Sequence, residues 1–113
     1  MTFDWKNLPE TALEHFKGGA GTVYVRTFAD KTNKIMVLRA PAGAGVGEHV
    51  HETNSEICYV IAGTMTFTVN GVQEETAAGQ SHYCPSHSTH ASQNNGTDEV
   101  LMVCVIPEHG GEA

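Results

Sequence analysis

The stretch GAGVGEHVHETNSEICYVIAG, residues 43–63, places two histidines one residue apart and follows them with a glutamate at the head of an apolar run. If this segment is extended, His49 and His51 project from the same face of the strand, about 6.6 Å apart. Two imidazoles in this position can bind one metal ion. Glu56 has the wrong parity for the same straight strand, but the polar residues 53–55 can reverse the chain and point its carboxylate back at the pair.

A further ligand of such a site has to come from another part of the chain. The segment HYCPSHSTH, residues 82–90, contains three more histidines, His82, His87 and His90. Each of them is a candidate, and spacing alone does not choose among them.

Short runs rich in β-branched and aromatic residues follow one another closely after residue 21, which is typical of a sandwich or barrel. Apolar and polar residues alternate regularly over residues 65–69. The Asn70-Gly71 pair that follows is a strong hairpin signal, because both turn positions need a positive φ. No segment between residues 22 and 106 has a sustained helical period. The sequence therefore predicts an all-β fold with strands at residues 22–28, 35–40, 56–62, 65–69, 72–76, 81–84, 90–94 and 100–106.

Composition limits the partners that the chain can have. The 113 residues carry a net charge of −7, and the six Lys and Arg residues are scattered, so no nucleic-acid partner is expected. The longest apolar runs, residues 57–62 and 100–106, fall short of the roughly 20 residues that a membrane helix needs. Residues 1–17 do not resemble a signal peptide. We therefore expect a cytoplasmic protein with no membrane partner.

The length fits one domain, which we divide into three parts. Residues 1–21, with Trp5 and several glycines, predict an N-terminal arm, a strand or short helix that packs on the barrel or on a partner. Residues 22–107 form the barrel, and residues 108–113 a flexible C-terminal tail. Because a monomer would leave the apolar strand at 100–106 and the Trp5 arm partly exposed, we expect a homodimer.

The first histidine segment resembles the first sequence motif of the cupin superfamily. It reads Gly43, five residues, His49, one residue, His51, four residues, Glu56, six residues and Gly63. This matches G(X)5HXH(X)4E(X)6G at every fixed position.

The second segment, residues 79–94, is similar to the second cupin motif, G(X)5PXG(X)2H(X)3N. Gly79, Pro85, His90 and Asn94 stand at the expected positions, and His87 replaces the central glycine. The fifteen residues between the two motifs are also like the short connection of small microbial cupins.

The resemblance implies a small single-domain cupin, with a double-stranded β-helix or jelly-roll barrel and one metal bound by His49, His51, Glu56 and His90. Three neutral imidazoles and a carboxylate suit a divalent transition metal such as Fe, Mn, Ni, Zn, Co or Cu. The general order of affinities of these metals for such ligands does not by itself identify the metal that is bound. Four ligands leave two octahedral positions open for a substrate or for dioxygen.

Two classes of function are compatible with such a site. The first is a metal-dependent enzyme acting on a small polar molecule, either a dioxygenase-type oxidoreductase or an isomerase or lyase in which the metal polarises a carbonyl or carboxylate. The alternative is a binding or sensor protein that holds the small molecule without turnover. The enzyme is favoured by four candidate proton carriers beyond the ligands, His87, Cys58, His82 and Tyr83.

Strand parity places three of these candidates. Cys58 lies two residues after Glu56, so in an extended strand it faces the metal side of the cavity. The alternative interpretation is that Cys58 is only a small residue that lines the barrel. His82 shares one strand face with Cys84, and Tyr83 takes the other, but the sequence does not say which face is inside.

His87 stands where the family has glycine, which predicts a positive φ at this turn. Its imidazole would then lie at the cavity rim, where a histidine can exchange a proton near neutral pH. The three cysteines, Cys58, Cys84 and Cys104, are odd in number and widely spaced, so we expect reduced thiols.

Overall fold

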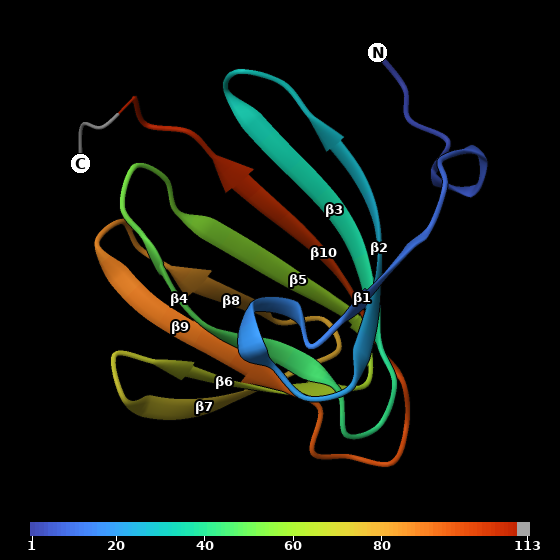
Figure 1. The fold of residues 1–113 in the computed structure, drawn as a ribbon, viewed down its shortest axis with the longest axis vertical. Coiled ribbons are helices and arrows are strands. Elements are labelled where there is room, and N and C mark those ends of the chain that lie inside the picture. The colour runs from blue at the N-terminus through green and yellow to red at the C-terminus, as the bar shows by residue number, and fades with distance from the viewer. Residues whose placement is uncertain (111–113) are drawn as a thin grey trace.

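The computed structural model describes residues 1–110, and its regular structure is almost entirely β (Figure 1). The strands are β1 (Thr11–Glu14), β2 (Thr22–Ala29), β3 (Asn33–Ala40), β4 (Gly45–His51), β5 (Glu56–Ala62), β6 (Thr64–Val69), β7 (Val72–Ala77), β8 (Ser81–Cys84), β9 (Ser88–Gln93) and β10 (Val100–Pro107). Two single-turn 3-10 helices, η1 (Trp5–Asn7) and η2 (Phe16–Gly18), precede β2. The all-β fold predicted from the sequence is confirmed.

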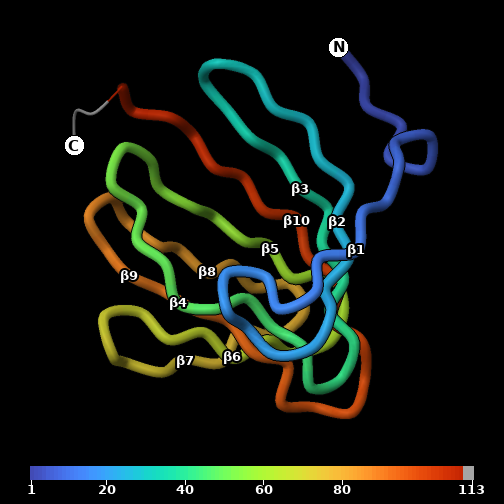
Figure 2. Tube along the Cα trace, viewed as in Figure 1, coloured from blue at the N-terminus to red at the C-terminus, as the bar shows by residue number. Residues whose placement is uncertain are grey.

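The strands form two antiparallel sheets that face each other (Figure 1). One sheet has the order β1-β2-β3-β10-β5-β8, and the other has the order β4-β9-β6-β7. The chain crosses repeatedly from one sheet to the other, as the trace in Figure 2 shows between β3 and β4 and between β9 and β10. This is the two-sheet arrangement expected of a double-stranded β-helix.

The core lies between the two sheets and follows the period of two that a strand imposes. Along β2, β3, β5 and β10, alternate side chains are buried, and the intervening ones face outward. Phe67 on β6 is the largest side chain in this core, at 1% exposure. The core also contains polar side chains, most of them near one end of β4, β5 and β9, and these form the candidate site.

Two turns have the left-handed backbone that the sequence predicts. Asn70 and Gly71 have φ values of 49° and 83°, as the tight hairpin between β6 and β7 requires. His87 has a φ of 67°, so the conformation expected at this glycine position of the motif is confirmed.

Asn94 fixes the connection between β9 and β10. Its side chain is fully buried, and its Nδ2 donates to the carbonyls of Ala40, at 2.9 Å, and Asp98, at 2.8 Å. Its Oδ1 accepts from the backbone N–H of Gly96 at 3.0 Å. Since three backbone groups depend on this one amide, the last residue of the second motif has a structural role.

Residues 1–21, for which we expect an N-terminal arm, contain the strand β1 and the 3-10 helices η1 and η2. Strand β1 pairs with β2 at the edge of the larger sheet, and Phe3 packs on Phe28 with ring centroids 4.6 Å apart. Arg26 donates to the carbonyl of Leu8 at 2.5 Å. Residues 108–110 of the expected tail are joined to the barrel, since the Glu108 N–H donates to Thr32 at 2.7 Å. Residues 111–113 lie outside the described residues.

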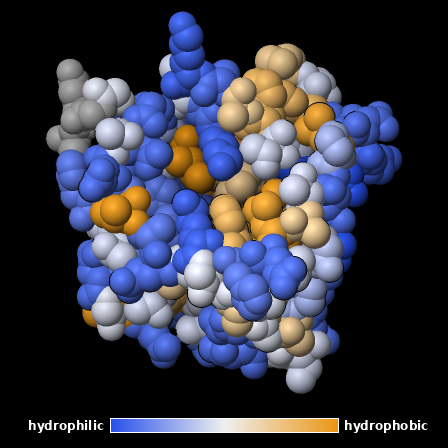
Figure 3. Space-filling model, viewed as in Figure 1, coloured by the Kyte–Doolittle hydropathy of each residue, from blue (hydrophilic) through white to orange (hydrophobic). Residues whose placement is uncertain are grey.

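The face shown in Figure 3 is mostly hydrophilic, with hydrophobic side chains in a few patches. The strand at 100–106, expected at a dimer surface, is the central strand β10, and its outward side chains are half-buried. Large apolar side chains are more exposed on the outer face of β5 and β8, at Ile57, Tyr59, Ile61 and Tyr83. The homodimer stays a prediction. Among residues 1–110 there is no helix of the length and hydrophobicity needed to cross a membrane.

Candidate metal centre

Two neighbouring strands of the smaller sheet supply the three histidines of the candidate site. His49 and His51 lie on the same face of β4, and His90 on β9 is paired directly with His49. Glu56 is the first residue of β5, on the opposite sheet, and it follows the polar turn after β4. The structure therefore brings together the four residues that the motif resemblance implied.

The four side chains converge on one point, with their ligand atoms all within 4.8 Å of one another. The Oε1 atom of Glu56 lies 3.0 Å from Nε2 of His51 and 3.0 Å from Nε2 of His90. The His90 Nε2 atom also lies 3.0 Å from Nε2 of His51 and of His49. His51, Glu56 and His90 are buried, and His49 is partly exposed.

Each of the three imidazoles has a partner at its other ring nitrogen. The Nδ1 atom of His49 lies 2.8 Å from the carbonyl of Gly47, and that of His51 lies 2.6 Å from Oδ1 of Asn54. These oxygens only accept, so both Nδ1 atoms carry a hydrogen, and in the neutral rings the Nε2 lone pairs point at the centre. Converging lone pairs repel unless a cation lies between them. The donor set thus fits a divalent transition metal.

The contacts within the cluster also shift the pKa values of Glu56 and His51. Burial by itself would raise the pKa of Glu56, but the three imidazoles of His49, His51 and His90 around it hold that pKa well below its ordinary value. The carboxylate is therefore ionised and able to bind a metal. Burial would likewise lower the pKa of His51, but hydrogen bonds to Glu56 and Asn54 outweigh it and raise that pKa above the ordinary 6.5.

We expect metal affinity to fall as the pH is lowered. A metal displaces the proton on His51 Nε2, and the raised pKa of this imidazole means that the proton competes even above pH 6.5. Chelator competition measures the metal affinity between about pH 8 and about pH 6. The affinity should fall by close to tenfold per pH unit near about pH 6. An affinity that stays constant over this range would contradict displacement of a proton.

The candidate metal centre opens into a cavity of about 500 Å³ between the two sheets. Apolar side chains of the core form much of its wall, among them Met36, Leu38 and Met102. Lysines 17, 31 and 34 also line it. The cavity therefore combines the candidate metal centre with an apolar wall and charged side chains of both signs.

Cys58 is on the metal side of β5, as strand parity predicted. It is buried, lines the cavity, and its Sγ donates to Oε2 of Glu56 at 3.4 Å. A hydrogen bond with Cys104, together with burial, raises its pKa well above the ordinary value, so the thiol is neutral. All three cysteines are free, as expected.

The other three proposed proton carriers lie outside the cavity wall. His82 and Cys84 face inward and Tyr83 faces outward, with 56% exposure, which settles the face of β8 that the sequence left open. His82 lies behind His90, and its Nε2 is 3.0 Å from Nδ1 of that ligand. His87 is exposed, and its backbone N–H donates to the carbonyl of His51. Proton transfer by any of them stays a prediction, and Tyr83 and His87 have no contact with the cavity.

Three residues near the centre were not identified from the sequence. Asn54 was treated only as part of a turn, although its position three residues after His51 suits a hydrogen bond to that ring. Lys34 shares the inner face of β3 with Met36 and Leu38, which strand parity could have shown. Glu74 contacts His82 across two sheets, and no local pattern indicates this.

Comparison with known proteins agrees with the fold. The sequence model of the Cupin domain family matches residues 36–106. An oxalate-binding protein from Thermotoga maritima is 29% identical over 100 residues, which are 83% of each chain. A crystal structure from the same organism, described as a predicted oxalate decarboxylase, has a TM-score of 0.89 at 24% identity and covers 96% of this chain and 99% of its own.

A more distant structure shows how widely the fold is shared. The cupin domain of Schizosaccharomyces pombe Cnp3 has a TM-score of 0.77 at 13% identity, and the match covers 95% of this chain and 73% of that one. At this identity the likeness concerns the fold alone. The family match, which spans more than half of the chain, decides the classification: this chain belongs to the cupin family.

Proposed function

We propose that the chain binds a small carboxylate anion of the size of oxalate on a divalent transition metal held by the four converging ligands. A metal there supplies a Lewis acid to which carboxylate oxygens bind. Four protein ligands leave two of six octahedral positions, which a dicarboxylate can fill. The name of the relative from Thermotoga maritima, an oxalate-binding protein, supports this class of ligand.

The observation that carries the proposal is a lysine in the cavity wall. Lys34 lies on the inner face of β3, is half-buried, and lines the same cavity as the metal ligands. Throughout residues 1–110 no carboxylate lies within ion-pair distance of it. A partly buried lysine in a cavity wall, without a carboxylate partner among these residues, favours an anionic ligand.

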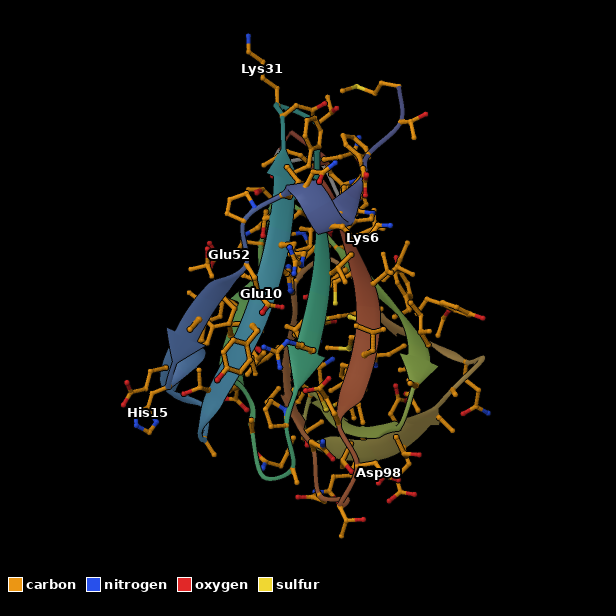
Figure 4. The ribbon with its side chains drawn as sticks, turned by 90° about the vertical axis from the view of Figure 1, so that its right-hand side faces the viewer. Lys6, Glu10, His15, Lys31, Glu52 and Asp98 are labelled. Atoms are coloured by element: carbon orange, nitrogen blue, oxygen red, sulfur yellow. The ribbon has the colours of Figure 1, made fainter. Side chains whose placement is uncertain are left out.

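Other charges around the cavity are consistent with an anion site. Three of the four lysines of this acidic chain line it, although Lys31 extends from the tip of the β2–β3 hairpin away from the barrel (Figure 4). Three carboxylates besides Glu56 line the cavity as well. Of these, Asp30 accepts from the backbone N–H groups of Thr32 and Asn33, and Glu52 is exposed. Lys34, on the inner face of β3, and Lys17, whose charge acts on His51, are therefore the two cations placed to meet a ligand bound at the metal.

Replacement of Lys34 by methionine tests this role. We expect the affinity of the metal-loaded protein for oxalate to fall by about 10- to 100-fold, because a hydrogen bond to a charged group contributes about 1.5–3 kcal/mol. Isothermal titration calorimetry measures the affinity, and metal content should stay unchanged. Lys6→Met is the matched control, because Lys6 lies on the N-terminal arm (Figure 4) and is not among the residues that line the cavity. Equal oxalate affinities in Lys34→Met and wild type would contradict the proposal.

Turnover of the bound anion is the second candidate, favoured by the Cys58 thiol beside Glu56 as a proton carrier in the cavity. The metal-loaded protein should be incubated with oxalate, with and without oxygen, and the remaining oxalate and released CO₂ measured. Turnover that consumes oxygen would identify an oxidoreductase, with ¹⁸O₂ incorporation marking a dioxygenase, and cleavage to CO₂ and formate without oxygen consumption would identify a lyase. Oxalate that binds and remains intact would identify a binding or sensor protein.

A further inference from the structure

A buried histidine stands directly behind the metal ligand His90. The side chain of His82, on β8, is fully buried, and its ring stacks on Phe67 with centroids 3.7 Å apart and an angle of 6° between the planes. Its own plane is nearly parallel to that of His90, at 12°, with centroids 5.2 Å apart. Phe67 thus holds the His82 ring in one plane, edge-on to the ring nitrogen of His90.

The hydrogen bonds of His82 run in one direction. Its Nδ1 lies 2.6 Å from Oε1 of Glu74, and its Nε2 lies 3.0 Å from Nδ1 of His90. An ionised carboxylate only accepts, so Nδ1 of His82 carries the hydrogen. With Nδ1 donating to Glu74, the neutral His82 ring presents its Nε2 lone pair to Nδ1 of His90. His90 therefore donates from Nδ1 and keeps its Nε2 lone pair for the metal.

We propose that Glu74 and His82 are positioning residues, which hold His90 in the tautomer and orientation that bind the metal. The inference rests on the metal site of the proposed function. The other two imidazoles each depend on one oxygen close in sequence, whereas His90 depends on a chain of two side chains from β8 and β7. Glu74 is directly opposite Phe67 in the β6–β7 ladder, so one pair of strands sets both the stacking and the hydrogen bond.

Loss of this chain would leave His90 in a different state. Without an acceptor at Nδ1, a neutral His90 gains by moving its proton to Nε2, which lies 3.0 Å from the Glu56 carboxylate. That proton occupies the lone pair that the metal needs, and binding would then leave a buried N–H without a partner. Outer partners of metal-binding histidines typically contribute about 10- to 100-fold to metal affinity.

The test uses His82→Phe, which keeps the stacking on Phe67 and removes both hydrogen bonds. We expect Co²⁺ affinity, measured by chelator competition, to fall by about 10- to 100-fold. The visible absorption of bound Co²⁺ should change, and the thermal stability of the metal-free protein should not fall. His82→Gln, whose amide can accept from His90 and donate to Glu74, should restore most of the affinity.

Two substitutions on β7 complete the series. Glu74→Gln keeps an oxygen acceptor without the charge, so its effect should be smaller than that of His82→Phe. Glu75→Gln is the matched control, because Glu75 is exposed and its side chain has no hydrogen bond or ion pair among residues 1–110. Unchanged Co²⁺ affinity and absorption in His82→Phe would overturn the proposal. The proposal would also be overturned if His82→Phe lost stability in its metal-free form together with its metal affinity, and if His82→Gln did not restore that affinity.

A readout without metal separates this inference from the proposed function. The ¹⁵N chemical shifts of His90 in the metal-free protein report which ring nitrogen carries the proton. We expect an Nδ1 proton in wild type and a shift toward Nε2 in His82→Phe. If wild type bound no metal, the proposed function would fail, and these shifts alone would decide whether Glu74 and His82 set the tautomer.

Discussion

Replacing His51 by alanine should lower divalent-metal affinity by more than about 100-fold, beyond the effect of losing an outer partner, while the barrel stays folded. The Nε2 atom of His51 lies within 3.0 Å of both Glu56 and His90, so the substitution removes a ligand from the middle of the cluster. The fold should persist because packing of ten strands supplies most of the stability of a chain of this length. Metal analysis after dialysis and circular dichroism would check the two parts separately.

The same result is expected for alanine at His49, Glu56 or His90. His87→Ala is the matched control, because it removes an exposed imidazole from the same end of the barrel without touching the centre. Full metal content in His90→Ala would show that the ligand assignment is wrong. Unfolding of every ligand variant in the absence of metal would show instead that these side chains are needed for the fold.

Phe67→Ala should reduce the free energy of unfolding by about 3–5 kcal/mol. Phe67 is 1% exposed and is the largest fully buried side chain, so its removal leaves a cavity that the rigid strands on both sides cannot close. For a chain of this size the loss corresponds to a fall in Tm of roughly 15 °C or more. Urea denaturation measures the free energy, and differential scanning calorimetry measures the Tm.

Phe28→Ala provides the comparison for this substitution. Phe28 is half-buried on the outer side of β2, where it packs on Phe3, so its removal should cost clearly less. Equal losses in the two variants would contradict the view that stability is concentrated between the sheets. Phe67→Ala should also weaken metal binding, since it removes the ring on which His82 stacks.

Local sequence patterns were sufficient to predict most of the fold. The alternation of apolar and polar residues at 65–69 and the Asn70-Gly71 turn predicted the β6–β7 hairpin, and the glycine position of the second motif predicted the positive φ of His87. These features depend on neighbours in the chain, which a strand or a tight turn fixes by itself. The structure of the arm, residues 1–21, was harder to predict, because a short segment with few apolar residues is equally compatible with a strand and with a 3-10 turn.

The candidate site was only partly predictable, because its members come from different strands. The parity of His49 and His51 is a local property, but the choice of His90 over His82 and His87 came from the resemblance to a family. The face of β8 could not be chosen because its four residues offer histidine and cysteine on one side and tyrosine on the other. The contact between Glu74 and His82 depends on the crossing from one sheet to the other, which no short pattern encodes.

The central claim is that a small dicarboxylate binds on a metal held by three histidines and a glutamate. Calorimetric titration of oxalate into Mn²⁺-loaded protein and into the same protein stripped with a chelator tests it most directly. We predict binding of one oxalate per chain to the loaded protein and no measurable binding to the stripped protein. Equal binding to both forms, or to neither, would contradict it.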